Sequence, residues 1–223
     1  MKNLIKYVPF LKYLLIMSIL FVPSCSFFEA DLNGEIFIVT EGRQNIKLAL
    51  VEISAIPEKD LISFIDKKKS DADKEIEIIR KKSNELHAET ESLKKQGGDA
   101  YGKKLKESIA NSDKEFKYYE GEYYYDGIPK SENICKSNAD GKFSLKLKRD
   151  TKYAIAAKSS RKIGDSEENY YWLVWVDMKK NPQTVMLSND NLIDMRSPDC
   201  AVKFSAREID LIEFHKRLKK MKF

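Results

Sequence analysis

The sequence predicts a mainly β fold that is interrupted by a long helical insertion and followed by a C-terminal amphipathic helix. Runs rich in β-branched and aromatic residues occur near the start and again in the second half of the chain, as in strands. Between them, residues 58–124 contain no proline, are densely charged and carry apolar residues at spacings of three and four. Because two strands alone are only marginally stable, we expect one β domain in two parts around the helices.

The first part of this β domain is expected at residues 34–57. Strands are predicted at 34–40 and 46–56, with a turn-forming segment between them. Pro57 would end the second strand, because proline has no N–H to donate to a β ladder.

Residues 58–124 are predicted to form a long antiparallel coiled-coil hairpin. A heptad seam runs along the first helix, and the paired glycines of Lys95–Asp99 interrupt it. A second apolar series follows, so two helices joined by a short turn are expected. At about 1.5 Å per residue, the first helix would extend roughly 45–50 Å and project from the domain. The predicted seam comprises Ile62, Ile65, Ala72, Ile76, Ile79, Leu86 and Leu93 in the first helix, and Leu105, Ile109, Phe116, Tyr119 and Tyr123 in the second.

The β pattern returns in residues 125–204, and residues 205–223 have the pattern of a basic amphipathic helix. Residues 142–148 alternate strictly, so Phe143 and every second residue after it should face the core. Further strands are expected at 153–157, 170–176 and 184–187, and the apolar stripe of the final helix comprises Leu211, Phe214, Leu218 and Met221.

The segment Asn138–Phe143, followed by an alternating strand and then by Tyr153–Ala157, resembles the carboxypeptidase regulatory-like, or transthyretin-like, β-sandwich family. In that family a turn of the Asp-Ala-Asp-Gly-Lys-Phe type opens a strand, and a tyrosine followed by small apolar residues begins a later one. Asn138 stands where aspartate is common, and Asp150–Lys152 replaces the usual proline-glycine. The resemblance implies a Greek-key sandwich that serves as a binding module without catalytic residues of its own.

The first 25 residues resemble the signal peptide of a bacterial lipoprotein. The first twelve residues carry three lysines and no acidic residue, and the apolar run at 13–22 is too short to span a membrane. Val22 and Ser24 stand where this family has an aliphatic and a small residue. The resemblance implies that residues 1–24 are removed and that Cys25 carries the lipid, such as palmitate.

The implied location is the bacterial cell envelope, with the lipid as the membrane anchor and residues 25–33 as a tether. Ser26 stands where aspartate often signals inner-membrane retention, which favours the outer membrane if the source is Gram-negative. Without its first 24 residues, the chain has nearly balanced charge and lacks the clustered basic surface of nucleic-acid-binding proteins. We therefore expect an envelope protein as the partner and no nucleic acid.

Two further cysteines, Cys135 and Cys200, form an even pair in an oxidising compartment, which permits a disulfide. The alternative is two unpaired thiols that pack as small apolar residues. The chain has no cysteine or histidine spacing typical of a metal site. The turn at Asn138–Gly141 departs from a calcium-binding loop, so we expect neither a metal nor another cofactor.

The sequence shows no catalytic constellation, and we expect that the protein is not an enzyme. His87 and His215 lie in predicted helices without an evident nucleophile. Carboxylate pairs occur at Glu167–Glu168 and at Glu120 with Glu122, but a third of the chain is charged and such pairs arise by chance.

Aromatic residues gather at the hairpin base and on the strand at 170–176. If one face of that strand is exposed, Tyr170, Trp172, Tyr123 and Tyr125 would form a patch for a glycan or peptide. The alternative is that the hairpin base buries both faces. The sequence therefore predicts a non-enzymatic, membrane-anchored adaptor that acts through its projecting hairpin, or a ligand-binding lipoprotein that uses this patch.

Overall fold

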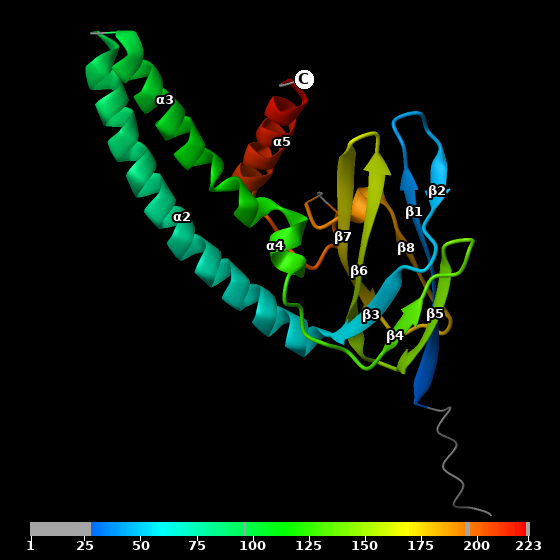
Figure 1. Cartoon of the computed structure of the whole chain (residues 1–223). Helices are drawn as coiled ribbons and strands as arrows, with labels where there is room; N and C mark the ends of the chain where they lie inside the picture. Colours follow the sequence, from blue (N-terminus) through cyan, green and yellow to red (C-terminus); the bar gives the residue numbers. More distant parts are fainter. Residues whose placement is uncertain (1–27, 96, 195–196, 222–223) are drawn as a thin grey trace, which may run out of the picture.

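The computed structural model describes residues 28–221 apart from 96, 195 and 196, and the side chains of 218–221 are not described. Figure 1 shows two β-sheets at one side of the molecule and a long helical arm that projects from them. Each sheet has four strands.

The first sheet is built around β1 (Glu29–Val39). This strand pairs antiparallel with β5 (Lys142–Lys148) and with β2 (Asn45–Lys47), and parallel with β8 (Gln183–Leu187). Buried and exposed residues alternate along β5 and along much of β1, as in strands with one face toward a core.

The second sheet has the order β4 (Ile134–Lys136), β3 (Glu52–Pro57), β6 (Lys152–Ile163), β7 (Ser166–Asp177), and all neighbours are antiparallel. β6 and β7 are the longest strands and pair along their full length without a break in register. Their outer halves carry mainly exposed residues and extend past the rest of the sheet (Figure 1).

The two sheets pack face to face over a shared apolar core. Side chains from β1, β5 and β8 join those from β3, β6 and β7 in one cluster of buried residues. Burial of alternate residues from both sheets is the usual way in which a sandwich is stabilised. Among the most deeply buried members are Leu32, Ile36, Leu147, Ile155 and Trp172.

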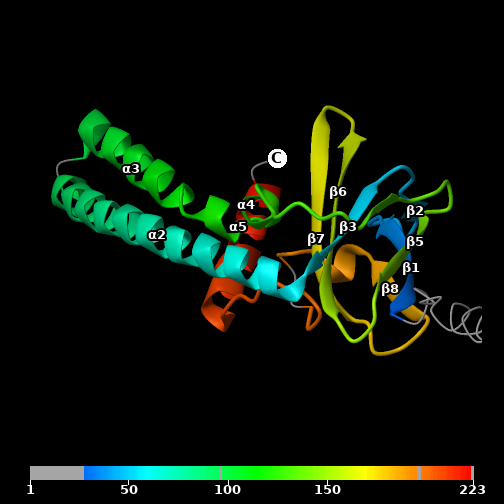
Figure 2. The same ribbon diagram turned by 90° about the horizontal axis from the view of Figure 1, so that it is seen from below.

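In the chain, the helical arm is inserted between β3 and β4, which are paired neighbours in the second sheet. It consists of α2 (Glu58–Lys94), α3 (Gly98–Asp113), the short 3-10 helix η3 (Phe116–Tyr119) and α4 (Gly121–Tyr125). Figures 1 and 2 show α2 and α3 side by side and antiparallel, with their connection far from the sheets.

The outer face of the second sheet is covered by the base of this arm. Leu61 and Ile65 from the first turns of α2, together with Tyr124 from α4, pack with Ala156 and Leu173 of the sheet. The second sheet is therefore buried on both faces, in the manner of sheets that carry helices.

The C-terminal helix α5 (Ala206–Met221) packs on the base of the arm. Its buried residue Ile212 joins Ala72 and Ile76 of α2 and the two tyrosines of η3, Tyr118 and Tyr119. α5 thus caps the junction between arm and sandwich.

The predicted fold class, a mainly β transthyretin-like sandwich with a coiled-coil hairpin, is wrong. Helices hold more of the described residues than strands do, so the fold is mixed α and β. A coiled coil buries residues of both helices along one seam. Here α2 has 37 residues, α3 has 16, and none of the α3 residues is buried.

Polar contacts join α3 to α2 instead. Asn111 Nδ2 donates to Ser83 Oγ at 2.9 Å, and Lys104 Nζ lies 2.8 Å from a carboxylate oxygen of Glu89. On α2 the predicted seam residues Ile65, Ala72, Ile76 and Leu86 are buried, but at the start of the helix Leu61 is buried in place of Ile62, which is 42% exposed. The sheet, and not α3, determines which face of the first turns of α2 is buried.

Several strand predictions are confirmed and others need correction. β5 coincides with the strand predicted at 142–148, including its inward residues. The strand predicted at 46–56 is instead two strands in different sheets, because Leu50 adopts a positive φ of 59° and turns the chain. In α5 the predicted stripe is wrong at Phe214, which is 53% exposed while Ile212 is buried.

Candidate functional site

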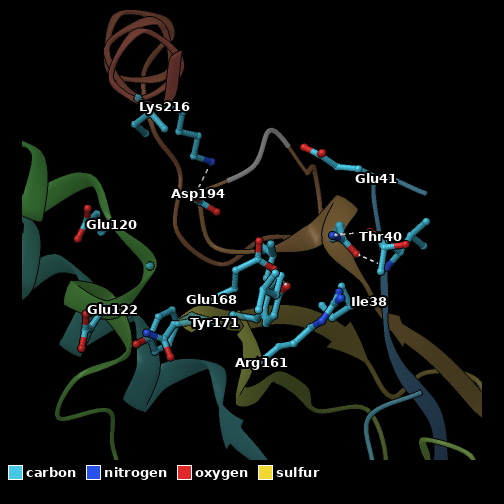
Figure 3. Close-up of a pocket in the computed structure, with 18 of the residues that line it drawn as sticks. Ile38, Thr40, Glu41, Glu120, Glu122, Arg161, Glu168, Tyr171, Asp194 and Lys216 are labelled. Atoms are coloured by element: carbon cyan, nitrogen blue, oxygen red, sulfur yellow. Dashed lines mark hydrogen bonds and ion pairs between the residues drawn. The ribbon is translucent and has the colours of Figure 1, made fainter. Parts of the chain in front are cut away.

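A cleft of about 1000 Å³ lies where one end of the sandwich, the base of the arm and α5 meet (Figure 3). The outer half of the β6–β7 hairpin lines one side. The end of β1 with its following turn, the segment around the short 3-10 helix η4 (Asn189–Asn191), the arm base and α5 form the other sides. Since these segments come from all parts of the chain, the cleft depends on the complete fold.

The β7 side of the cleft is organised around Glu168. Its neighbour in the β6–β7 ladder is Arg161, and both side chains line the cleft. The hydroxyl of Tyr170 donates a hydrogen bond to the Glu168 carboxylate, while the Tyr170 ring stacks on Trp172 with centroids 6.1 Å apart. Burial, and then the Glu168 carboxylate, raises the pKa of Tyr170 to about 12. A neutral phenol therefore holds this carboxylate at the cleft.

The arm base approaches β7 closely at Gly121. A Cβ atom at this position would lie 3.1 Å from the Cβ of Tyr171, which is tighter than most side-chain contacts. This approach brings Glu120 and Glu122 to the cleft wall (Figure 3). Burial raises the pKa of Tyr171, and Glu122 adds to the rise through its charge and its hydrogen bond with the phenol.

The α5 side of the cleft is fixed by three kinds of contact. The His215 ring stacks on Phe116 with centroids 3.8 Å apart and an angle of 13° between the planes. Lys216 Nζ forms an ion pair at 2.5 Å with Asp194, and Ile212 is buried against the arm base. These contacts place α5 as a wall of the cleft.

The described residues that line the cleft carry an excess of negative charge. Asp194 is paired with Lys216, and the Tyr170 hydroxyl donates to Glu168. The acidic residues are Glu41, Glu120, Glu122, Glu168 and Asp194, and the basic ones are Arg161 and Lys216.

The histidines and cysteines are dispersed over the fold. His87 is exposed on the arm, His215 is stacked at the cleft, and the two described cysteines lie in the cores. Within residues 28–221, gaps excepted, no group of three histidine, cysteine or acidic side chains is placed to hold a metal ion. The arrangement supplies charged and hydrogen-bonding groups for recognition.

The predicted aromatic patch is not exposed on the surface of the protein. Trp172 and Tyr170 face the core between the sheets, where Trp172 is fully buried and its Nε1 donates to the Ser188 carbonyl oxygen at 2.8 Å. On the other face, Tyr125 packs on Tyr171. Tyr123 donates its hydroxyl to the Lys68 carbonyl oxygen at 2.9 Å. The alternative interpretation, in which the hairpin base covers the second face, describes the structure.

Of the two alternatives for Cys135 and Cys200, the structure has the unpaired one, because both are free thiols. They belong to different cores: Cys135 packs against the cluster between the sheets, whereas Cys200 lies in the cluster under the arm. The second sheet separates these clusters, so the thiols do not meet. The third cysteine, Cys25, lies outside the described residues.

The cleft itself was not predicted. In the sequence, Glu120, Glu122 and Glu168 belong to carboxylate pairs of a kind that arises by chance, and no motif distinguishes Arg161 or Asp194. Nothing in the local sequence indicates that these residues, which lie up to 74 positions apart, share one cleft.

Comparisons with known protein families, with curated proteins and with solved structures found no match to this chain. Among the helices in the described part of the chain, none combines the length and apolar character needed to cross a bilayer.

Proposed function

We propose that this chain is a membrane-tethered, non-catalytic binding protein that presents its cleft and its helical arm to a partner protein. The observation that carries the proposal is the course of β1. This strand begins at Glu29, close to Cys25 in sequence, and ends at Val39 on the edge of the cleft. Its 11 residues extend about 35 Å at roughly 3.3 Å per residue.

A lipid on Cys25 would therefore hold the membrane at the end of β1 that is remote from the cleft. Figure 1 shows the start of β1 and the far end of the arm at opposite extremes of the molecule. A partner in the surrounding compartment could then reach both the cleft and the arm. The lipoprotein-like sequence up to Cys25 supports this tether, and Ser26 favours the outer membrane if the source is Gram-negative.

The surface of the arm supports a role in protein recognition. α3 is held to α2 by polar contacts, and both helices expose apolar side chains between charged ones. Ile78 on α2 is 63% exposed and Ile109 on α3 is 51% exposed. Apolar groups of this kind are available for a partner surface.

Two measurements on the full chain in its own cells test this proposal. Labelled palmitate should enter the wild-type chain and should not enter a Cys25→Ser variant, which should leave the membrane fraction. Label that persists in the variant would refute the tether.

A photo-crosslinking residue then tests the cleft. Placed at Asn169 on the cleft wall, it should form one adduct of defined mass with a second protein. The matched control is Met186, which is 59% exposed on the other sheet. Adducts of equal yield at both positions, or none at Asn169, would contradict a partner in the cleft.

A further inference from the structure

We propose that a small pocket between the base of the arm and α5 binds a small primary alkylammonium ion. The pocket has a volume of about 210 Å³ and is distinct from the cleft, with Tyr119 as the one described residue that lines both. This inference therefore goes beyond the proposed function. The polar groups of the pocket are Lys69 and Asp73 of α2, Tyr124 of α4 and Glu208 of α5.

The remaining walls of the pocket are apolar and aromatic. Ala72 and Ile76 lie one turn apart on α2, and both are buried in the same cluster as the two tyrosines of η3, which also line the pocket. Tyr124 packs edge to face against Phe204, just ahead of α5, with ring centroids 5.5 Å apart. Such walls suit an alkyl chain, and tyrosine rings also attract cations through their π faces.

The hydroxyl of Tyr124 is the observation that points to a ligand. The side chain is only 3% exposed, yet its hydroxyl takes part in no hydrogen bond among the residues that the structure describes. The oxygen atom is not sealed inside the protein, and the space that Tyr124 lines is this pocket. Burial raises the pKa of the phenol, and the charges of Glu208 and Asp73 raise it further, so a neutral hydroxyl stands beside two carboxylates. Because buried polar groups are normally hydrogen-bonded, this hydroxyl lacks the partner that a ligand would supply.

The charged groups of the pocket call for one positive charge. Within the described part of the chain, Asp73 belongs to no ion pair. On Glu208, Oε2 accepts from Ser205 N at 2.5 Å, which leaves Oε1 as an acceptor for a ligand. Lys69 supplies the one cation among the lining residues, and it donates to the Lys203 carbonyl oxygen. Two carboxylates against one ammonium group leave one negative charge, which a monovalent cation balances.

A primary ammonium group matches these acceptors. Its three N–H groups can donate to the carboxylates of Asp73 and Glu208 and to the oxygen of Tyr124. The pocket has the volume of about seven water molecules at about 30 Å³ each, so an alkyl chain of about four carbon atoms fits beside the apolar walls. A metal ion is a poorer match, because the described residues place no three histidine, cysteine or acidic side chains around one point.

The first test is isothermal titration calorimetry of n-butylammonium chloride into the full chain in a non-ionic detergent at about pH 7.5. We expect saturation of one site per chain. Butanol, which has the same chain without the charge, and tetramethylammonium, which has the charge without an N–H group, should each bind at least tenfold more weakly. Absence of saturable binding up to about 20 mM would overturn the proposal, and equal binding of either control compound would overturn the assignment of an ammonium group.

A second probe separates a free amine from the lysine side chain of another protein. Nα-acetyl-lysine N-methylamide carries the same ammonium group on a peptide backbone and is too large for a pocket of about 210 Å³. It should bind at least tenfold more weakly than n-butylammonium. Equal or tighter binding would overturn the assignment to a small free amine.

Two pairs of matched variants test the residues of the pocket. Tyr124→Phe should weaken n-butylammonium at least tenfold without lowering Tm, because its hydroxyl has no hydrogen bond to lose in the free protein. Tyr123→Phe removes a hydrogen bond to the backbone of α2 and should lower Tm but leave the affinity unchanged. Asp73→Asn should weaken binding at least fivefold, whereas Asp71→Asn, which breaks an exposed ion pair outside the pocket, should not. A Tyr124→Phe chain that binds like the wild type, or equal losses in the two aspartate variants, would overturn the proposal.

Discussion

Replacement of Gly34 by alanine should destabilise the sandwich selectively. Gly34 on β1 lies opposite Phe143 on β5, and the Phe143 ring covers the glycine backbone. A Cβ atom at residue 34 would lie 2.1 Å from Cζ of Phe143, whereas carbon atoms in contact are normally about 3.5–4.0 Å apart. The ring would have to move by at least about 1.4 Å within a closely packed core.

The magnitude follows from the packing. Overfilling a packed core destabilises by about 1–3 kcal/mol, and three atoms of the Phe143 ring lie within 2.6 Å of the added Cβ. We therefore expect Gly34→Ala to lower the free energy of unfolding by about 2–3 kcal/mol. For a chain of this length, that corresponds to a fall in Tm of about 4–12 °C.

The assay is urea unfolding of the purified chain, followed by the fluorescence of Trp172 and Trp175. The matched control is Gly102→Ala in α3, where an added Cβ meets no atom within 4 Å. In a helix this change should stabilise by about 0.5–1 kcal/mol. In a Phe143→Ala background, the loss caused by Gly34→Ala should largely disappear. A Gly34→Ala chain as stable as the wild type, or a loss unaffected by Phe143→Ala, would refute the reasoning.

Three further predictions concern the core and its titrating groups. Leu61→Ala should lower the free energy of unfolding by about 2–5 kcal/mol, whereas Ile62→Ala should change it by less than about 1 kcal/mol, because only Leu61 is buried. Equal losses in urea unfolding would contradict the burial of Leu61 rather than Ile62 at the start of α2. Burial raises the pKa of Cys200 to about 11, so its thiol should resist Ellman's reagent at pH 8 until the chain unfolds; rapid reaction of the folded protein at this cysteine would contradict its burial. Burial also raises the pKa of Tyr125 and of Tyr170 from 10.0 to about 12. The stability that these neutral phenols contribute should therefore be complete below pH 10 and fall as pH rises toward 12. If a double Tyr→Phe variant lost stability at alkaline pH in the same way as the wild type, this titration would not be the cause.

Local signals in the sequence were sufficient for the strands and insufficient for the packing between elements. β5 was predicted to the residue because it is half-buried, and half-burial imposes strict alternation on the sequence. The seam of α2 was misassigned at Ile62, because the spacing of apolar residues does not tell which neighbour covers them. Near α2's start that neighbour is the second sheet, through Leu61 and Ile65, and not a second helix.

The aromatic residues illustrate the same limit. Alternation correctly divided Tyr170 and Trp172 from Tyr171 and Trp175, but it did not show that both faces of β7 are covered from Tyr170 onward. The carboxylates of the cleft lie in elements that meet only after folding, and their sequence neighbours give no sign of it. A site that is assembled from charged residues on distant segments can be found only in the tertiary structure.

Photo-crosslinking from the cleft wall of the full chain in its own cells tests most directly that the cleft receives a partner protein. One adduct of defined mass at Asn169, with none of equal yield at Met186 on the other sheet, is the predicted result. No adduct at Asn169, or adducts of equal yield at both positions, would contradict the account.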